Sequence, residues 1–561
     1  MAFVVEEEGR RRKKKEEHAT DTTARVGKKP SVINLVLLIG LLVGLSLLLA
    51  WTSPARVRVT LVDAGSGKPV PGVLRVMATD ESRPLSLKGL LPRGQGMEET
   101  KDPSGSLYSI LEWYALPAAA EVPLPRKQIV LEAFSGLESE LARVDLDLRE
   151  SVPENVIVPM RFFSQVSKDR WFGGNTHLHL KDLDAESTQR YLSEIPYVDR
   201  LDLLFISHLK RAIWPSKPRG STRDDESYST NSYPLGELGR LRKGGPLLSN
   251  GEEHRNNLPG GTGFGHVMLL GVQELVRPVS IGPQIEGEGS DGTPLQNGIL
   301  EARKQGGTTI WCHNQYGWED VPNFVAGNLD GLNLFDGGRN DGNSYDNWYQ
   351  FLNAGLQVPV SSGTDWFMYD LSRVYVRVEP TLSSKSWLEA LASGYTFITS
   401  GPLLEFKVQG KGVGEVVPLQ QPGKVRVMGS AKGRRPFGKL ELVQNGRVVH
   451  QIESTPEEGH FRADLEFELQ VDVPSWLALR TAGPGTSYYG WPLFSHTSAT
   501  YISIKGKMRR SGEARNALIS EMEEALADIQ RKAIFFSGEE RQRVLRVYQR
   551  GIEALRISAG G

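Results

Sequence analysis

The sequence predicts a multidomain protein that combines α/β and β architecture: an N-terminal transmembrane helix, a β-sandwich, a barrel of strands and helices, a second β-sandwich and C-terminal helices. Three patterns predict this order. An uncharged apolar run lies near the N-terminus, and segments in which apolar and polar residues alternate lie on either side of the centre. Between them, short apolar strands alternate with helical stretches. The length of 561 residues also exceeds what one hydrophobic core usually organises.

The composition excludes several classes of function. The 66 basic and 67 acidic residues nearly cancel, so no overall charge favours nucleic acid, and none is expected as a partner. The single cysteine, Cys312, excludes an intramolecular disulfide framework and a thiolate-rich zinc site.

Residues 32–52 are predicted to anchor the chain in a lipid bilayer. The run from Val32 to Trp51 carries no charge and, as a helix, would be about 30 Å long, which matches the hydrocarbon thickness of a membrane. RRRKKK precedes it and only Arg56 and Arg58 follow closely, so the positive-inside rule places the N-terminus in the cytoplasm. The bulk of this single-pass membrane protein would then be extracytoplasmic, in the periplasm or on the cell surface.

A cleaved signal peptide is the alternative to a retained anchor. The long polar leader, residues 1–31, and the lack of a small-x-small cleavage site argue against it. The leader itself is basic and has no apolar periodicity, so it is expected to be disordered.

Residues 53–165 are predicted to form a small antiparallel β-sandwich. ARVRVTLVD alternates with period two, and glycines and prolines in GSGKPVPGV mark the turn that follows it. That turn resembles those of prealbumin-like or carboxypeptidase-regulatory-like modules. No cluster of reactive side chains stands out in this segment, which favours a spacer between the membrane and the next domain.

Residues 166–400 are predicted to form a barrel of mainly parallel strands. Apolar strands such as LDLLFIS and GTTIWCHN alternate with helical stretches such as LQNGILEARKQG. Six of the ten histidines lie between positions 177 and 313, at the ends of these strands. Reactive side chains of such barrels gather where the strands end.

The strand-end residues have the chemistry of a metal site. His177 and His179 are two residues apart, so they point to the same side of a strand and can converge on one ion. Imidazoles and carboxylates without thiolates suit zinc, manganese or iron beside exchangeable water. The ordered series is His177, His179, His208, Glu253, His266, His313 and Asp365.

This series resembles that of the PHP superfamily (polymerase and histidinol phosphatase). GNTHLHL is similar to its opening H-x-H motif, GEEHRNN and GFGHVMLLG to its glutamate strand and the strand after it, IWCHN to its later histidine, and SSGTDW to its closing aspartate. The resemblance covers about Trp171 to Gly401 and implies a distorted (β/α)7 barrel with metal-dependent phosphoesterase activity. WLEALASGYTFITSGPLLEFKVQG and PLFSHTSATYI resemble the CehA/McbA-type metallohydrolase branch, which is named after members that cleave carbamate-type bonds.

Two departures from the family pattern reduce the expected number of ions. Ser207-His208 stands where the superfamily often has Asp-His, and Asp365-Trp366-Phe367 stands where it often ends in Asp-x-His. Two ligands of a three-metal site are therefore missing, which predicts one or two divalent ions. Asn314 also replaces the proline that usually follows the later histidine.

The matched order assigns a role to each candidate residue. The predicted metal ligands are His177, His179, Glu253, His266, His313 and Asp365. Glu253 and His208 are the predicted catalytic residues, and His208 could instead hydrogen-bond a neighbouring ligand. Lys210 and Arg211 could hold an anionic group of a small-molecule substrate, although a solvated charge pair is the alternative. Asp336 fits a turn former and a site residue equally well, and Glu252 and His254 are interpreted as flanking residues.

Residues 401–506 are predicted to form the second β-sandwich and residues 507–561 two helices. Asn445-Gly446 predicts a two-residue hairpin turn, and Ser537-Gly-Glu-Glu540 predicts a helix start. His496 fits a structural role better than a contact at the domain rim. Two functions stay open: an exported, membrane-anchored metal-dependent hydrolase acting on a phosphoester, carbamate or amide-type bond, or a degenerate barrel that serves as a cell-surface binding or assembly module.

Overall fold

The computed structural model describes residues 54–97, 109–209, 236–260, 263–336 and 344–557. The predicted leader and anchor lie outside these ranges, as do Lys210 and Arg211. Within these ranges, no helix is both long and apolar enough to cross a membrane. The anchor and its topology therefore stay predictions.

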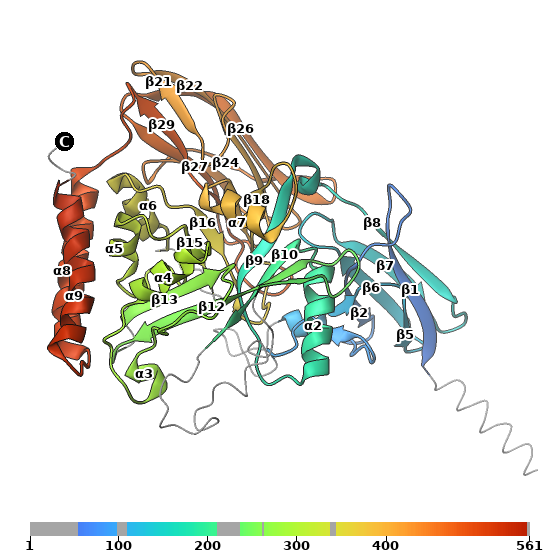
Figure 1. The fold of residues 1–561 in the computed structure, drawn as a ribbon. Coiled ribbons are helices and arrows are strands. Elements are labelled where there is room, and N and C mark those ends of the chain that lie inside the picture. Colours follow the sequence, from blue (N-terminus) through green and yellow to red (C-terminus); the bar gives the residue numbers. More distant parts are fainter. Residues whose placement is uncertain (1–53, 98–108, 210–235, 261–262, 337–343, 558–561) are drawn as a thin grey trace, which may run out of the picture. The chain divides into compact units, whose positions relative to one another are not determined.

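The chain from residue 54 onward forms one compact unit of mixed α/β architecture with several sheets, as the sequence predicts (Figure 1). Two sheets come first. The three-stranded sheet consists of β5 (Ala120–Leu124), β1 (Ala55–Asp63) and β8 (Asn155–Met160). The five-stranded sheet consists of β3 (Leu91–Pro92), β4 (Tyr114–Leu116), β2 (Gly72–Ala78), β6 (Gln128–Phe134) and β7 (Ala142–Asp147). The pair β1–β8 is parallel, so this region is not antiparallel throughout.

A closed sheet follows, built from strands of the central and later parts of the chain. Its first strands are β9 (Trp171–His179), β10 (Leu203–His208), β11 (Glu237–Gly239), β12 (Leu247–Asn257), β13 (Gly263–Leu270), β14 (Thr308–Trp311), β15 (Gly331–Phe335), β16 (Val360–Ser362), β17 (Asp365–Trp366), β18 (Arg373–Arg377) and β19 (Thr396–Thr399). The pairs β9–β10, β10–β12, β14–β15 and β15–β16 are parallel, as the alternation of strands and helices predicts. In contrast, β13 runs antiparallel to both of its neighbours.

Helices connect the strands of this region. They are α2 (Ala185–Val198), α3 (Pro283–Glu286), α4 (Leu295–Lys304), α5 (Asp320–Val325), α6 (Ser344–Ala354) and α7 (Ser384–Ala392). The helix α2 begins at a favourable cap, because the Asp184 carboxylate accepts a hydrogen bond from Ser187 N at 2.7 Å. Its buried side includes Tyr191, Leu192 and Ile195, which belong to the same core as Leu178 on β9.

The later strands are shared between two sheets. A four-stranded sheet holds β20 (Leu403–Val408), β22 (Gly423–Gly433), β26 (His460–Val471) and β25 (Thr455–Glu457). The other strands continue the closed sheet: β21 (Val416–Leu419), β23 (Lys439–Gln444), β24 (Arg447–Glu453), β27 (Ser475–Ala482), β28 (Ser495–Thr497) and β29 (Thr500–Ile504). Asn445 and Gly446 join β23 to β24 with φ of 52° and 89°, as the predicted hairpin turn requires. The domain borders predicted at residues 165 and 400 stay predictions, and one hydrophobic core runs across both positions.

Two C-terminal helices complete the chain, as predicted. They are α8 (Gly512–Lys532) and α9 (Gly538–Ile557), and they pack on each other and on α5 and α6 (Figure 1). The Ser537 hydroxyl caps α9 by accepting a hydrogen bond from Glu540 N at 3.1 Å. The predicted apolar face is buried through Val544, Leu545, Val547, Tyr548 and Ile552.

His496 lies in the interior on β28. Its Nδ1 donates to Thr497 O at 2.8 Å, so its bare Nε2 accepts from the Tyr349 hydroxyl at 2.7 Å. Burial lowers the pKa of His496 to about 3. The residue is therefore neutral in the folded protein.

This neutral histidine predicts a loss of stability in acid. The unfolded chain binds a proton at the ordinary histidine pKa of about 6.5, whereas the folded chain does not until about pH 3, so the free energy of unfolding falls between these values. At pH 4.5 the loss is about 2.5 kcal/mol. The drop in the free energy of unfolding between pH 7.5 and pH 4.5 can be measured by urea denaturation. For His496→Gln this drop should be smaller, by that amount, than for the unsubstituted protein. An equal difference in both proteins would contradict the assignment.

Candidate metal centre

The strand β9 carries the first two candidate ligands. His177 and His179 are fully buried and point to one side, while Leu178 between them enters the hydrophobic core. The two Nε2 atoms lie 2.9 Å apart. The H-x-H spacing thus brings two imidazole nitrogens to one point.

The partners of the two Nδ1 atoms show which nitrogen of each ring carries the proton, and so how the Nε2–Nε2 contact is interpreted. His179 Nδ1 lies 2.9 Å from Ser207 O, a carbonyl that only accepts, so Nδ1 is the protonated nitrogen. His177 Nδ1 lies 2.7 Å from Asp336 Oδ2 and donates to that carboxylate. In the neutral rings both Nε2 atoms are then bare lone pairs facing each other. Two such lone pairs at 2.9 Å repel each other unless a proton or a metal ion lies between them.

Two carboxylates face the same point. Glu253 on β12 brings Oε2 to 3.1 Å from His179 Nε2, and Asp365 on β17 brings Oδ1 to 3.5 Å from His177 Nε2. β17 pairs in parallel with β9, opposite Leu178 and His179, which sets the position of Asp365. His177, His179 and Asp365 together form a group with ligand atoms within 4.8 Å of one another.

A second group adjoins the first and consists of Glu253, His266 and His313. Glu253 Oε1 lies 2.9 Å from His266 Nδ1, while its other oxygen faces His179. Although buried, His313 Nδ1 has no hydrogen-bond partner among the described residues. An unpaired imidazole nitrogen near a carboxylate and a second histidine fits a site that receives a cation. The Glu253 carboxylate therefore lies between the two groups.

The backbone aims two of these residues from an unusual conformation. His313 has φ of 53° and Asp365 has φ of 57°, both in the left-handed region that side chains other than glycine seldom adopt. Such strained positions concentrate at functional sites. Gly363 adds a close approach, because a Cβ at this position would lie 2.3 Å from His177 Cβ.

Asp336 lies at the site, whereas its sequence context fits a turn former and a site residue equally well. It lies directly after β15, is buried, and is also held by Asn333 Nδ2, which donates at 3.0 Å. It orients His177 in the way that carboxylates commonly orient metal-binding histidines. Cys312, His177 and Asp336 form a third group of potential ligand atoms. Burial raises the pKa of the Cys312 thiol.

The charges of the site are strongly coupled. Burial opposes the charged form of His177, but the negative charges of Asp336 and Asp365 outweigh it and raise its pKa well above the ordinary value. Burial also opposes ionisation of Glu253, but His266 and His179 outweigh it and hold its pKa well below the ordinary value. Burial lowers the pKa of His266 to about 4. Glu253 is thus ionised and His266 neutral, which are the states that bind metal, whereas His177 has to release a proton when an ion binds.

The remaining candidates are not members of these groups. His208 ends β10 and is buried, but none of the three groups found among the described residues includes it. Glu252 points away from the site, since Oε2 accepts from Val276 N at 2.8 Å. His254 lies 3.5 Å from that same oxygen. Both agree with their interpretation as flanking residues.

An arginine from the N-terminal sheets supports the segment that carries Asp365. Arg93, just after β3, is fully buried, and its guanidinium forms a bidentate ion pair with Asp199 at the end of α2. The same group donates to Met368 O and to Asp370 O, the latter at 2.8 Å. Nothing in the local sequence signals this contact, because Arg93 is separated from Asp370 by 277 positions.

Comparisons with protein-family models, with curated proteins and with solved structures found no match to this chain.

Proposed function

We propose that this protein is a metal-dependent hydrolase whose centre is formed by His177, His179, Asp365, Glu253, His266 and His313. The observation that carries the proposal is the pair of bare Nε2 atoms 2.9 Å apart, faced by two carboxylates. Neutral rings cannot hydrogen-bond in that arrangement, whereas a proton on His177 Nε2 or a shared divalent cation stabilises it, and the two facing carboxylates favour the divalent cation. The order of these residues along the chain, similar to that of the PHP superfamily, gives further support.

The available ligand atoms restrict which metal ions the centre can bind. Imidazole and carboxylate ligands without a thiolate suit zinc, manganese or iron, and two adjoining groups can hold one or two ions. A bound divalent ion would lower the pKa of a water molecule toward neutrality and so supply the nucleophile for hydrolysis.

The protein's own residues have separate tasks in this proposal. Ser207 O and Asp336 hold the two rings of β9 so that their Nε2 atoms face the centre. Glu253 spans the two groups, with one carboxylate oxygen toward His179 and the other toward His266, and can orient a water molecule at the centre. We assign the substrate to the class of small molecules with a phosphoester, carbamate or amide-type bond.

Metal removal and replacement test the function. Elemental analysis of the purified full chain should find one or two equivalents of a transition metal, an estimate that follows from the two ligand groups. Chelation followed by dialysis should abolish hydrolysis in a screen of aryl phosphates, phosphodiesters, carbamates and anilides, and adding back zinc, manganese or iron should restore it. A folded, metal-free protein that binds none of these ions would refute the proposal and support a binding or assembly module.

A further inference from the structure

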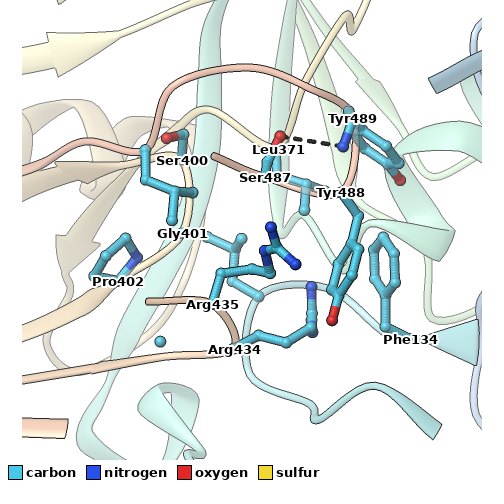
Figure 2. A pocket seen from close by; sticks show the side chains of 13 residues that line it. Phe134, Leu371, Ser400, Gly401, Pro402, Arg434, Arg435, Ser487, Tyr488 and Tyr489 are labelled. Atoms are coloured by element: carbon cyan, nitrogen blue, oxygen red, sulfur yellow. Dashed lines mark hydrogen bonds between the residues drawn. The ribbon is translucent and has the colours of Figure 1, made fainter. Parts of the chain in front are cut away.

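A second polar site lies away from the metal-binding groups, where three parts of the chain meet. Figure 2 shows a pocket lined by Phe134 of β6, by the consecutive residues Arg434 and Arg435 after β22, and by Tyr488. The pocket has an empty volume of about 360 Å³, including the part open to solvent.

Arg434 and Arg435 differ in their ion pairing from arginines on the nearby strands. Arg426 on β22 pairs with Glu466, and Arg480 on β27 pairs with Glu441 at 2.7 Å. Arg434 and Arg435 form no ion pair with any carboxylate in the described part of the chain. Two adjacent guanidinium groups thus face one pocket without a directly paired carboxylate among the described residues.

Backbone carbonyls occupy only some of the N–H donors of Arg434 and Arg435. Arg434 Nε donates to Ser139 O at 2.6 Å and its Nη2 donates to Gly136 O. Arg435 Nε donates to Thr486 O at 3.1 Å. Arg434 Nη1 and both Nη atoms of Arg435 make no hydrogen bond to the described residues, which leaves donors for a ligand.

Aromatic rings hold both guanidinium groups in place. Arg434 lies over the Phe134 ring at 4.2 Å, and Arg435 lies over the Tyr488 ring at 4.8 Å. The rings of Phe134 and Tyr488 stack on each other with centroids 5.9 Å apart. The four side chains form one continuous stack, so the two cations are positioned before any ligand arrives, which reduces the entropy cost of binding.

The surroundings make this unneutralised charge unfavourable. Burial lowers the pKa of Arg434 to about 10, so the group is still charged at neutral pH but destabilised. A bound anion would offset this penalty, since guanidinium groups form strong, charge-assisted hydrogen bonds with carboxylates and phosphates.

We propose that Arg434 and Arg435 form a binding site for a small oxyanion, a phosphate or carboxylate group, in the pocket between β6 and the chain after β22. The site is distinct from the proposed metal centre and does not depend on it. It binds free anions or the anionic end of a small molecule through the open Nη donors of the two arginines.

Calorimetric titration of the full chain with inorganic phosphate tests the site, with chelator present so that no metal contributes. Saturable binding is expected, and Arg435→Gln should weaken it about tenfold or more, because one charged donor pair is lost. Arg435→Lys should retain part of the affinity. The matched control is Arg426→Gln, which removes an arginine already neutralised by Glu466 and should leave phosphate binding unchanged.

Parallel titrations with acetate and with chloride separate the possible ligands. Tighter binding of phosphate assigns a phosphate site, and tighter binding of acetate assigns a carboxylate site. Equal, weak binding of all three anions would overturn the proposal, as would unchanged phosphate binding by Arg435→Gln. Circular dichroism of each variant verifies that the fold is kept. If Arg435→Gln fails to fold, the comparison of Arg434→Lys with Arg426→Gln decides.

Discussion

Replacing both histidines of β9 by alanine should abolish metal binding and reduce hydrolysis at least about a thousandfold. The substitution His177→Ala with His179→Ala removes the two nitrogens that converge at 2.9 Å and leaves Glu253 and Asp365 without their partners. Several kcal/mol of charge stabilisation in the transition state would be lost. Elemental analysis and initial rates of hydrolysis measure the two effects.

The matched control for this pair is His450→Ala. His450 lies on β24 with an exposed side chain that contacts the Phe467 ring, and it belongs to none of the metal-binding groups in the described ranges. It should keep full metal content and activity. If the double variant folds and retains its metal, the ion is bound elsewhere and the proposed centre is wrong.

Replacing Arg93 by alanine should lower the free energy of unfolding by about 3–5 kcal/mol, because it leaves the buried Asp199 carboxylate without its counter-charge. Met368 O and Asp370 O would lose a hydrogen-bond donor as well. Urea denaturation followed by tryptophan fluorescence gives the change in stability.

Arg75→Ala is the comparison for this second prediction. Arg75 pairs with Glu112 and Glu132 within the N-terminal sheets, but its side chain is 19 % exposed, so water can replace part of the interaction. Arg75→Ala should therefore lower the free energy of unfolding clearly less than Arg93→Ala does. Equal losses for the two variants would contradict the larger cost expected for the fully buried Arg93–Asp199 pair.

The parts of the site that the sequence predicts are those that depend on local geometry. Alternation along a strand places His177 and His179 on one side, and the position of Glu253, His313 and Asp365 at strand ends brings them to the same region. These residues do lie together in the structure. The two C-terminal helices also follow from periodicity and a cap, both of which are local signals.

The parts that the sequence does not predict depend on contacts between distant segments. The antiparallel direction of β13 and the continuation of the closed sheet into β27–β29 are set by pairing that no short motif records. Asp336 resembles an ordinary turn residue until its carboxylate is seen beside His177. Arg93 resembles a surface arginine in a module interpreted as a spacer, although it is fully buried.

The closure of the sheet sets an order of events in the maturation of the protein. On one side β9 pairs with β10, which follows soon in the chain, but on its other side it pairs with β17 and β18. Asn175 Nδ2, for example, donates to Thr364 Oγ1 across 189 positions. A nascent chain that ends before this point lacks Asp365 and the strand that aims it. If the centre holds a cation, we therefore expect it to bind only after the chain has been synthesised past Asp365 and the sheet has closed.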